Sequence, residues 1–253
     1  MSTWNMESAI VPVTGAASGI GLAVCERLRA TGATPLLLDW DEQKLHVATK
    51  QVYKDSDESS RFCYLVDVRD SRAVDECFVS IARTHGPATH AVAAAGIVQP
   101  ADILSLTDES WQQVIDVNLN GAMYFCRAAA RHMAEAKRGS IVNIASIGGL
   151  SARESRVSYV ASKAAMINMT RAMAIDLGGF GVRVNAVAPG VIDTPIQNRN
   201  RGTFQNITER VALKRIGTPN EVANVTLFLL SELASYVTGS TIVVDGGMTA
   251  SYR

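Results

Sequence analysis

The sequence predicts an α/β fold, a doubly wound and mainly parallel sheet with helices on both faces, in a single domain. Short apolar runs alternate with longer segments of helical periodicity, as in repeated β-α units with right-handed crossovers. The length of 253 residues suits one such domain, so residues 1–253 are assigned to it. Glycine and polar residues follow the apolar runs, at the carboxyl edge of the sheet where such folds bind ligands.

Each expected element follows from its local pattern. Strands are expected at residues 9–13, 34–38, 61–66, 91–95, 140–145, 182–188 and 241–244, which are apolar runs bounded by turn residues. Helical periodicity covers residues 22–28, 41–50, 71–84, 108–134, 159–177 and 219–230, with Ser71 as an expected cap. Pro12 lies inside the first strand, where it removes a backbone donor and allows a bulge.

A glycine-rich segment joins the first expected strand to the first expected helix. It reads Thr14-Gly15-Ala16-Ala17-Ser18-Gly19-Ile20-Gly21. Glycines permit positive φ and a close approach of the backbone to a ligand, and a helix N-terminus attracts a pyrophosphate. The spacing differs from the commonest dinucleotide fingerprint, so this segment alone fits a plain turn and cap as well as a nucleotide loop.

Asp39 favours the nucleotide loop. It follows the second expected strand, eighteen residues after Gly21. An acidic side chain about 20 residues beyond the glycines accepts hydrogen bonds from the adenosine ribose hydroxyls, and it repels a 2′-phosphate. No Arg or Lys lies within the loop or next to Asp39. We therefore predict NAD rather than NADP as the cofactor, with Trp40 either flanking the adenine or packing in the ordinary way.

Tyr159 and Lys163 are spaced to share one face of an expected helix. A cation beside a phenol favours the phenolate and lowers its pKa from about 10, which suits a general acid or base. Ser146, at the end of the preceding strand, supplies a hydroxyl that can hold the same substrate oxygen. Tyr-x-x-x-Lys alone is common on solvated helices, but here it shares a chain with the glycine loop.

Composition excludes several classes of function. The 24 basic and 24 acidic residues give a formal net charge of zero, which argues against a nucleic-acid or membrane partner. The four cysteines and four histidines lack the spacing of metal ligands, so no metal site is expected. The N-terminus does not resemble a signal peptide, and no apolar run reaches about 20 residues. These features predict a cytoplasmic protein.

Together these motifs resemble the short-chain dehydrogenase/reductase family over nearly the whole chain. The resemblance implies a Rossmann fold and an enzyme that interconverts a secondary alcohol and a ketone by hydride transfer, with Tyr159 as general acid or base. It also implies a homotetramer. The catalytic residues would be Asn118, Ser146, Tyr159 and Lys163. The cofactor residues would be Gly15, Ser18, Gly19, Ile20, Gly21, Asp39, Trp40, Asp67, Val68, Ala95, Gly96, Tyr159, Lys163, Pro189, Gly190, Ile192 and Thr194, and Asp245-Gly246-Gly247 matches a C-terminal signature.

The chain departs from the family pattern after its fourth expected strand. The family usually has an asparagine where this chain reads Ala93-Ala94-Ala95-Gly96, and Thr89-His90 replaces a step that usually contains aspartate. Because the missing amide normally ties neighbouring strands together, the expected effect is on local stability and on the floor of the cofactor site.

The substrate is expected to be a small alcohol or ketone. Residues 147–158 and a lid over residues 194–211 should face it. Arg153, Arg156, Arg199 and Arg201 suggest the hypothesis of an anionic substrate, since arginine suits carboxylate, sulfonate or phosphate. The alternative is that these arginines face water, or pair with Glu154 or a neighbouring subunit.

Two other functions stay open at this point. One is an NADPH-dependent 3-oxoacyl-carrier-protein reductase, which Asp39 argues against. The other is a nucleotide-sensing or scaffold protein on the same fold, which the complete catalytic set argues against.

Overall fold

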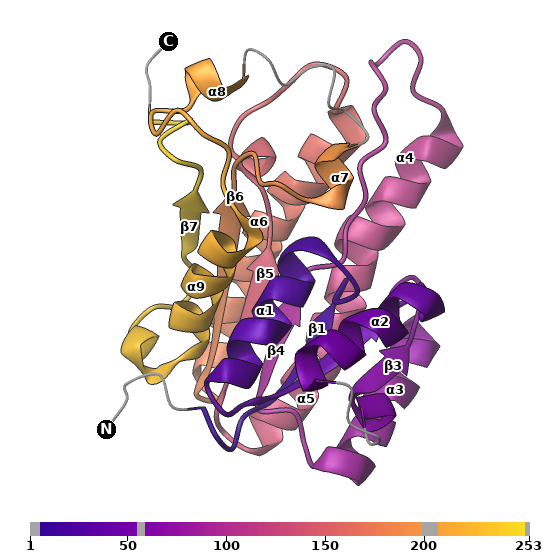
Figure 1. Cartoon of the computed structure of the whole chain (residues 1–253), viewed down its shortest axis with the longest axis vertical. Coiled ribbons are helices and arrows are strands. Elements are labelled where there is room, and N and C mark those ends of the chain that lie inside the picture. The colour runs from indigo at the N-terminus through magenta and orange to yellow at the C-terminus, as the bar shows by residue number, and fades with distance from the viewer. Residues whose placement is uncertain (1–5, 55–58, 199–206, 251–253) are drawn as a thin grey trace.

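The computed structural model describes residues 6–54, 59–198 and 207–250. These residues form one seven-stranded parallel sheet with helices on both faces (Figure 1). The strand order is β3-β2-β1-β4-β5-β6-β7, so the order reverses between β1 and β4. The strands are β1 (Ile10–Thr14), β2 (Thr34–Asp39), β3 (Cys63–Leu65), β4 (His90–Ala93), β5 (Gly139–Ile144), β6 (Val182–Pro189) and β7 (Thr241–Val244). This architecture confirms the predicted doubly wound α/β class.

Two apolar layers hold the helices against the sheet. Alternate residues of β2 point to opposite faces, so Leu37 packs in one layer while Leu36 and Leu38 pack in the other. The first layer holds α1 (Gly19–Ala30), α2 (Glu42–Tyr53) and α9 (Pro219–Leu230). The second holds α3 (Ser71–His85), α5 (Gly121–Glu135) and α6 (Val157–Gly178). The shorter helices are α4 (Asp108–Ile115), α7 (Pro195–Asn198) and α8 (Ile207–Arg210).

The expected long helix over 108–134 is interrupted. Between α4 and α5 the backbone forms a π-helical turn, Asp116–Asn120, which contains the fully buried Asn118. Such turns are often found at functional sites. Periodicity alone could not predict it, because a π-turn continues the helix with only one extra residue.

Side-chain contacts explain two further differences from the expected elements. The carboxylate of Asp70, not Ser71, caps α3, because it accepts hydrogen bonds from the N–H groups of Arg72 and Ala73 at 2.9 and 3.0 Å. β4 ends at Ala93 because the next two N–H groups turn to the Thr14 hydroxyl instead of a strand.

Pro12 is accommodated at the centre of the sheet. β1 pairs with β4 only through Val13↔Val92 and Thr14↔Ala93, so this ladder begins after the proline. Before it, the Thr89 hydroxyl accepts a hydrogen bond from the Ile10 N–H at 3.0 Å. A side chain therefore replaces part of the ladder that Pro12 prevents.

Over residues 6–54, 59–198 and 207–250, no helix is long and apolar enough to cross a membrane. No group of three His, Cys, Asp or Glu side chains within these ranges is arranged to hold a metal ion. All four cysteines are free thiols, and three of them are buried.

Candidate active site

The glycine loop between β1 and α1 is shaped for close approach. Gly15 has φ +64°, and a Cβ there would lie 2.8 Å from the Ala95 Cα. A Cβ on Gly21 would lie only 2.3 Å from the Gly15 carbonyl oxygen. Helix α1 then begins after Ser18 without a side-chain cap and without an acidic residue in its first turn. The loop therefore offers backbone N–H groups and positive potential to an anion, as a dinucleotide pyrophosphate requires.

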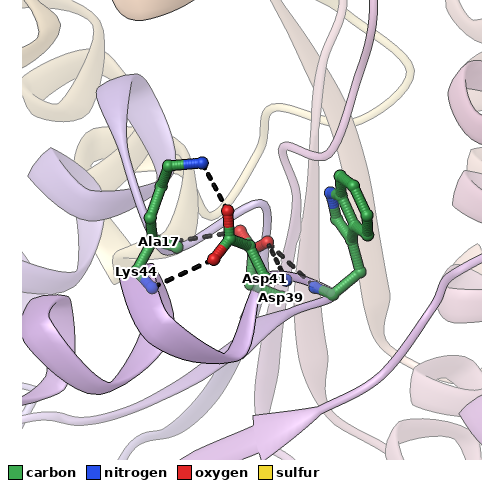
Figure 2. A network of polar contacts seen from close by, with 5 residues as sticks. Ala17, Asp39, Asp41 and Lys44 are labelled. Atoms are coloured by element: carbon green, nitrogen blue, oxygen red, sulfur yellow. Dashed lines mark hydrogen bonds and ion pairs between the residues drawn. The ribbon is translucent and has the colours of Figure 1, made fainter.

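The Asp39 carboxylate lies against this loop (Figure 2). One of its oxygens accepts a hydrogen bond from the Ala17 N–H at 3.1 Å, and the other accepts from the N–H groups of Trp40 and Asp41 at 2.9 and 3.1 Å. We call these three N–H donors the Asp39 nest. Trp40 is 73% exposed, so its indole is not packed into the core. The end of β2 therefore places an acid and a free aromatic face beside the loop.

Lys44 is a feature of this region that the sequence analysis missed. Its N–H donates to the Asp41 carboxylate at 3.1 Å, and its ammonium forms an ion pair with the same carboxylate. Asp41 thus caps α2 and holds a cation near Asp39. The signal in the sequence was the Asp-x-x-Lys spacing at a helix start, where positions i and i+3 face each other.

Two further segments reach the same edge of the sheet. Val68 is buried, whereas the carboxylate of the neighbouring Asp67 binds the Arg69 guanidinium. This ion pair lowers the pKa of Asp67. The second segment, residues 190–194, follows β6 and brings Thr194 against the glycine loop. A Cβ on Gly19 would lie 3.4 Å from the Thr194 Cγ2.

Asn118 joins three segments of the site. Its amide oxygen accepts a hydrogen bond from the Ile97 N–H at 2.8 Å, and its amide nitrogen donates to the Ile97 carbonyl at 3.0 Å and to the Ser162 hydroxyl at 3.1 Å. The absent side chain of Gly96 leaves room here, because a Cβ would lie 3.3 Å from the Asn118 amide oxygen and 3.5 Å from the Lys163 Nζ.

Ser146 and Tyr159 meet at one point. A Cβ on Gly148 would lie 3.3 Å from the Ser146 Oγ and 3.4 Å from Cε1 of the Tyr159 ring. Burial raises the pKa of Tyr159, while the hydrogen bond with Ser146 and the charge of Arg156 act to lower it. The strand β5 and the helix α6 therefore bring a hydroxyl and a phenol to one small region, as the sequence predicted.

Lys163 is fully enclosed below them. Its Nζ donates to the Ile144 carbonyl at 2.9 Å and lies 6.0 Å from the centroid of the Tyr159 ring. Burial lowers the pKa of Lys163 to about 8. The ammonium is directed at the Ile144 carbonyl, and the net direction of the Tyr159 pKa is upward. A lowering of the phenol pKa by Lys163 stays a prediction.

Comparison with known proteins agrees with this geometry. Residues 15–249 match the family model described as "Enoyl-(Acyl carrier protein) reductase". Over 245 residues the chain is 35% identical to 3-oxoacyl-[acyl-carrier-protein] reductase of Thermotoga maritima, with 96% of this chain and 99% of that protein covered. Over 251 residues it is 35% identical to meso-2,3-butanediol dehydrogenase of Serratia marcescens, with 98% and 97% covered. The chain belongs to the short-chain dehydrogenase/reductase family.

A solved member of this family has the same fold. The crystal structure of a short-chain type dehydrogenase/reductase from Mycobacterium marinum matches with a TM-score of 0.92 and 29% identity, over 98% of each chain. Membership makes this chain an oxidoreductase of alcohols and ketones that uses a nicotinamide dinucleotide, and it argues against a purely nucleotide-sensing role. The sequence resemblance to the family is confirmed.

The arginines expected near the substrate are only partly described. Arg153 is exposed, and Arg156 is partly buried at the start of α6, where its guanidinium donates to the Ser155 carbonyl at 3.0 Å. Within the described ranges neither arginine forms an ion pair. The pKa of Arg156 is lowered mainly by burial and, to a smaller extent, by the charge of Arg153. Arg199 and Arg201 lie outside the described residues, as does the central part of the expected lid over 194–211, residues 199–206.

Lys163 leads to a prediction about stability and pH. Below pH 8 the folded chain carries a buried charge, whereas between pH 8 and 10.5 the unfolded chain binds more protons and rising pH stabilises the fold. Lys163→Met removes this dependence. We expect its free energy of unfolding, relative to the parent, to fall by up to about 3 kcal/mol from pH 7 to pH 10.5.

Urea unfolding of both proteins across this pH range measures the difference. The exposed Lys54, replaced by Met, is the control and should give a difference that does not change with pH. If the difference in free energy of unfolding between Lys163→Met and the parent changes as little with pH as that of the control, the pKa of the buried ammonium is not depressed.

Proposed function

We propose that this enzyme interconverts a secondary alcohol and a ketone with NAD as cofactor, using Tyr159 as the general acid or base. The observation that carries the proposal is the meeting of the Ser146 hydroxyl with the Tyr159 ring at Gly148, next to a glycine loop that fits a dinucleotide. The nicotinamide, when bound, supplies the hydride acceptor or donor. The residues of this chain supply orientation, proton transfer and electrostatics.

Each catalytic side chain has a distinct task in this proposal. In the oxidation direction Tyr159 takes the proton from the alcohol oxygen, and Ser146 donates a hydrogen bond to that oxygen and stabilises its developing charge. Lys163 contributes a positive charge beneath the phenol, and Asn118 links this lysine to solvent through water. The glycine loop, Asp67-Val68 and the segment from Pro189 to Thr194 hold the dinucleotide.

Replacing the phenol tests this mechanism. Tyr159→Phe keeps the ring and removes the proton-carrying oxygen, so turnover should fall by at least about 10²-fold while NAD binding stays nearly intact. Steady-state rates and NADH binding measure the two effects. Tyr236→Phe is the matched control, since Tyr236 is fully exposed. Near-normal turnover of Tyr159→Phe would rule out the proposed role.

The preference for NAD rests on the position of Asp39. Its carboxylate accepts from the Ala17 N–H inside the glycine loop, where it can also accept from the ribose hydroxyls and repel a 2′-phosphate. The nearest basic side chain along this junction, Lys44, is already paired with Asp41. Both features favour a cofactor that carries no 2′-phosphate.

Direct binding distinguishes the two cofactors. We expect NADH to bind at least about tenfold more tightly than NADPH, because a like-charge contact in the ribose site opposes the phosphate. Titration of each reduced cofactor, followed by its fluorescence, gives the two dissociation constants. Tighter binding of NADPH would instead favour the second candidate, an NADPH-dependent 3-oxoacyl-carrier-protein reductase, which the Thermotoga relative supports by its named activity.

We further propose that the small-molecule substrate carries an anionic group. Arg156 lies three residues before Tyr159 and is partly buried without a carboxylate partner in the described structure, and Arg153 adds a second cation nearby. A desolvated guanidinium without a counterion is costly. A carboxylate or sulfonate on the substrate would supply the missing charge and a bidentate partner.

Arg156→Gln tests this substrate class. For a hydroxy acid or hydroxy sulfonate the Michaelis constant should rise by about 10- to 100-fold, which is the range for losing charge-assisted hydrogen bonds. For a matched neutral alcohol it should stay unchanged. Because the Arg156 charge lowers the Tyr159 pKa, the pH–rate profile should move to higher pH with both substrates.

Arg171→Gln, an exposed arginine farther along α6, is the control for this experiment. Unchanged Michaelis constants for charged and neutral substrates in Arg156→Gln would assign Arg156 to the surface or to a subunit interface. The search would then turn to neutral cyclic, sugar or steroid alcohols.

We also propose a homotetramer, in the cytoplasm. β7 forms an edge of the sheet and has the apolar residues Ile242, Val243 and Val244, none of which is buried. In α6, Ile175 is 81% exposed. Contacts between subunits through these two elements would cover this apolar surface.

A further inference from the structure

The Asp39 nest is a backbone anion site that the chain fills with its own carboxylate. Its three N–H donors come from two segments, the glycine loop and the turn after β2, and all three lie within 3.1 Å of a carboxylate oxygen. Backbone N–H groups that converge in this way form anion sites, and phosphate is among the anions that they bind. Removing the Asp39 carboxylate therefore leaves donors suited to a 2′-phosphate, and not an inert gap.

Asp41 controls the cation next to the nest. Figure 2 shows the oxygens of the Asp41 carboxylate directed at the N–H and the ammonium of Lys44, beside the Asp39 nest. The bond to the ammonium is the main cause of a lowered pKa of Asp41. Lys44 is the only basic residue in the stretches 14–21 and 39–45 that build this corner. While Asp41 is charged, this cation is engaged.

We propose that Asp41 is a second determinant of cofactor choice, because it holds Lys44 away from the position of a 2′-phosphate. Neutralising both Asp39 and Asp41 would turn the nest into a 2′-phosphate site with Lys44 as its cation. This inference rests on the proposed preference for NAD, and in it the Asp41 side chain acts through Lys44.

Charge explains why Asp39 alone is not sufficient. The stretch from Asp39 to Lys44 has three acids and one base, so a 2′-phosphate near it meets net repulsion. With Asp39 neutral, Asp41 and Glu42 still outnumber Lys44. With both aspartates neutral, the remaining Glu42 lies at i+2 from Lys44, and such positions on a helix do not face each other. Only then is the ammonium free to turn to a phosphate.

Calorimetric binding of 2′,5′-ADP and 5′-ADP tests the proposal without any turnover. The variants are Asp39→Ser, Asp39→Ser with Asp41→Asn, and this pair with Lys44→Gln. Asparagine caps helices about as well as aspartate, so Asp41→Asn removes the charge while keeping the start of α2. Thermal unfolding checks that each variant is folded.

We expect Asp39→Ser to bind 2′,5′-ADP only slightly better than the parent. Adding Asp41→Asn should improve this affinity by about tenfold, as one released charge-assisted contact allows at a partly exposed site. Lys44→Gln should remove that gain. Affinity for 5′-ADP should fall with Asp39→Ser, because this carboxylate accepts from the ribose hydroxyls. It should then stay nearly constant when Asp41→Asn and Lys44→Gln are added, because 5′-ADP has no 2′-phosphate.

Glu42→Gln, combined with Asp39→Ser, is the matched control because it removes one negative charge from the same helix turn without releasing Lys44. An equal gain from Glu42→Gln, or a gain that survives Lys44→Gln, would overturn the role of Asp41 and reduce the effect to net charge. Tighter binding of 2′,5′-ADP than of 5′-ADP by the parent protein would separately refute the NAD preference.

Discussion

The buried amide of Asn118 holds the active site in register. Asn118 ties the segment after β4, through both polar groups of Ile97, to Ser162 on α6. Tyr159 and Lys163 belong to the same helix, so their placement against the sheet depends on this contact. The π-turn matters because it presents the amide at that position, and Gly96 matters because a side chain there would crowd both Asn118 and Lys163. A buried amide that is fully hydrogen-bonded rigidifies its surroundings at little cost, whereas a misplaced one would be expensive.

The sequence was sufficient for the fold because the core pattern and the turn residues agreed. Apolar runs predicted all seven strands, and their alternation with helices predicted that the sheet is parallel. The order of the strands within the sheet was not predicted. What local patterns could not show was how distant side chains end or replace ladders. Thr14 ends β4 through two N–H groups, and Thr89 compensates for Pro12 at the neighbouring strand. Both are contacts between residues far apart in the chain, so no local periodicity contains them.

The candidate site divides in the same way. Spacing and resemblance both point to Ser146, Tyr159, Lys163 and Asn118, and the structure places these side chains close to one another. The electrostatics of these residues could not be derived from the sequence. The i, i+4 rule placed a lysine near a phenol, but it did not show that the ammonium donates to the Ile144 carbonyl, or that the charge of Arg156 also acts on the Tyr159 pKa. Likewise Asp39 was readable as an acid after a strand, whereas its three N–H partners and the engagement of Lys44 by Asp41 required three dimensions.

These electrostatic details share one physical logic. The chain buries a phenol and an ammonium together, at a cost in folding free energy, and it satisfies its own carboxylate with backbone donors that a ligand could use. Functional sites commonly keep groups that cost folding free energy, while the rest of the fold supplies the stability. Here the stability comes from two apolar layers on a seven-stranded sheet. The position of Tyr159 and Lys163 depends on that rigid support, since the Asn118 amide holds α6 against the sheet through Ser162. The proposed selectivity at the ribose end makes a smaller demand on the fold, because it depends on charges at the end of β2 and the start of α2, which belong to other elements than the residues on α6.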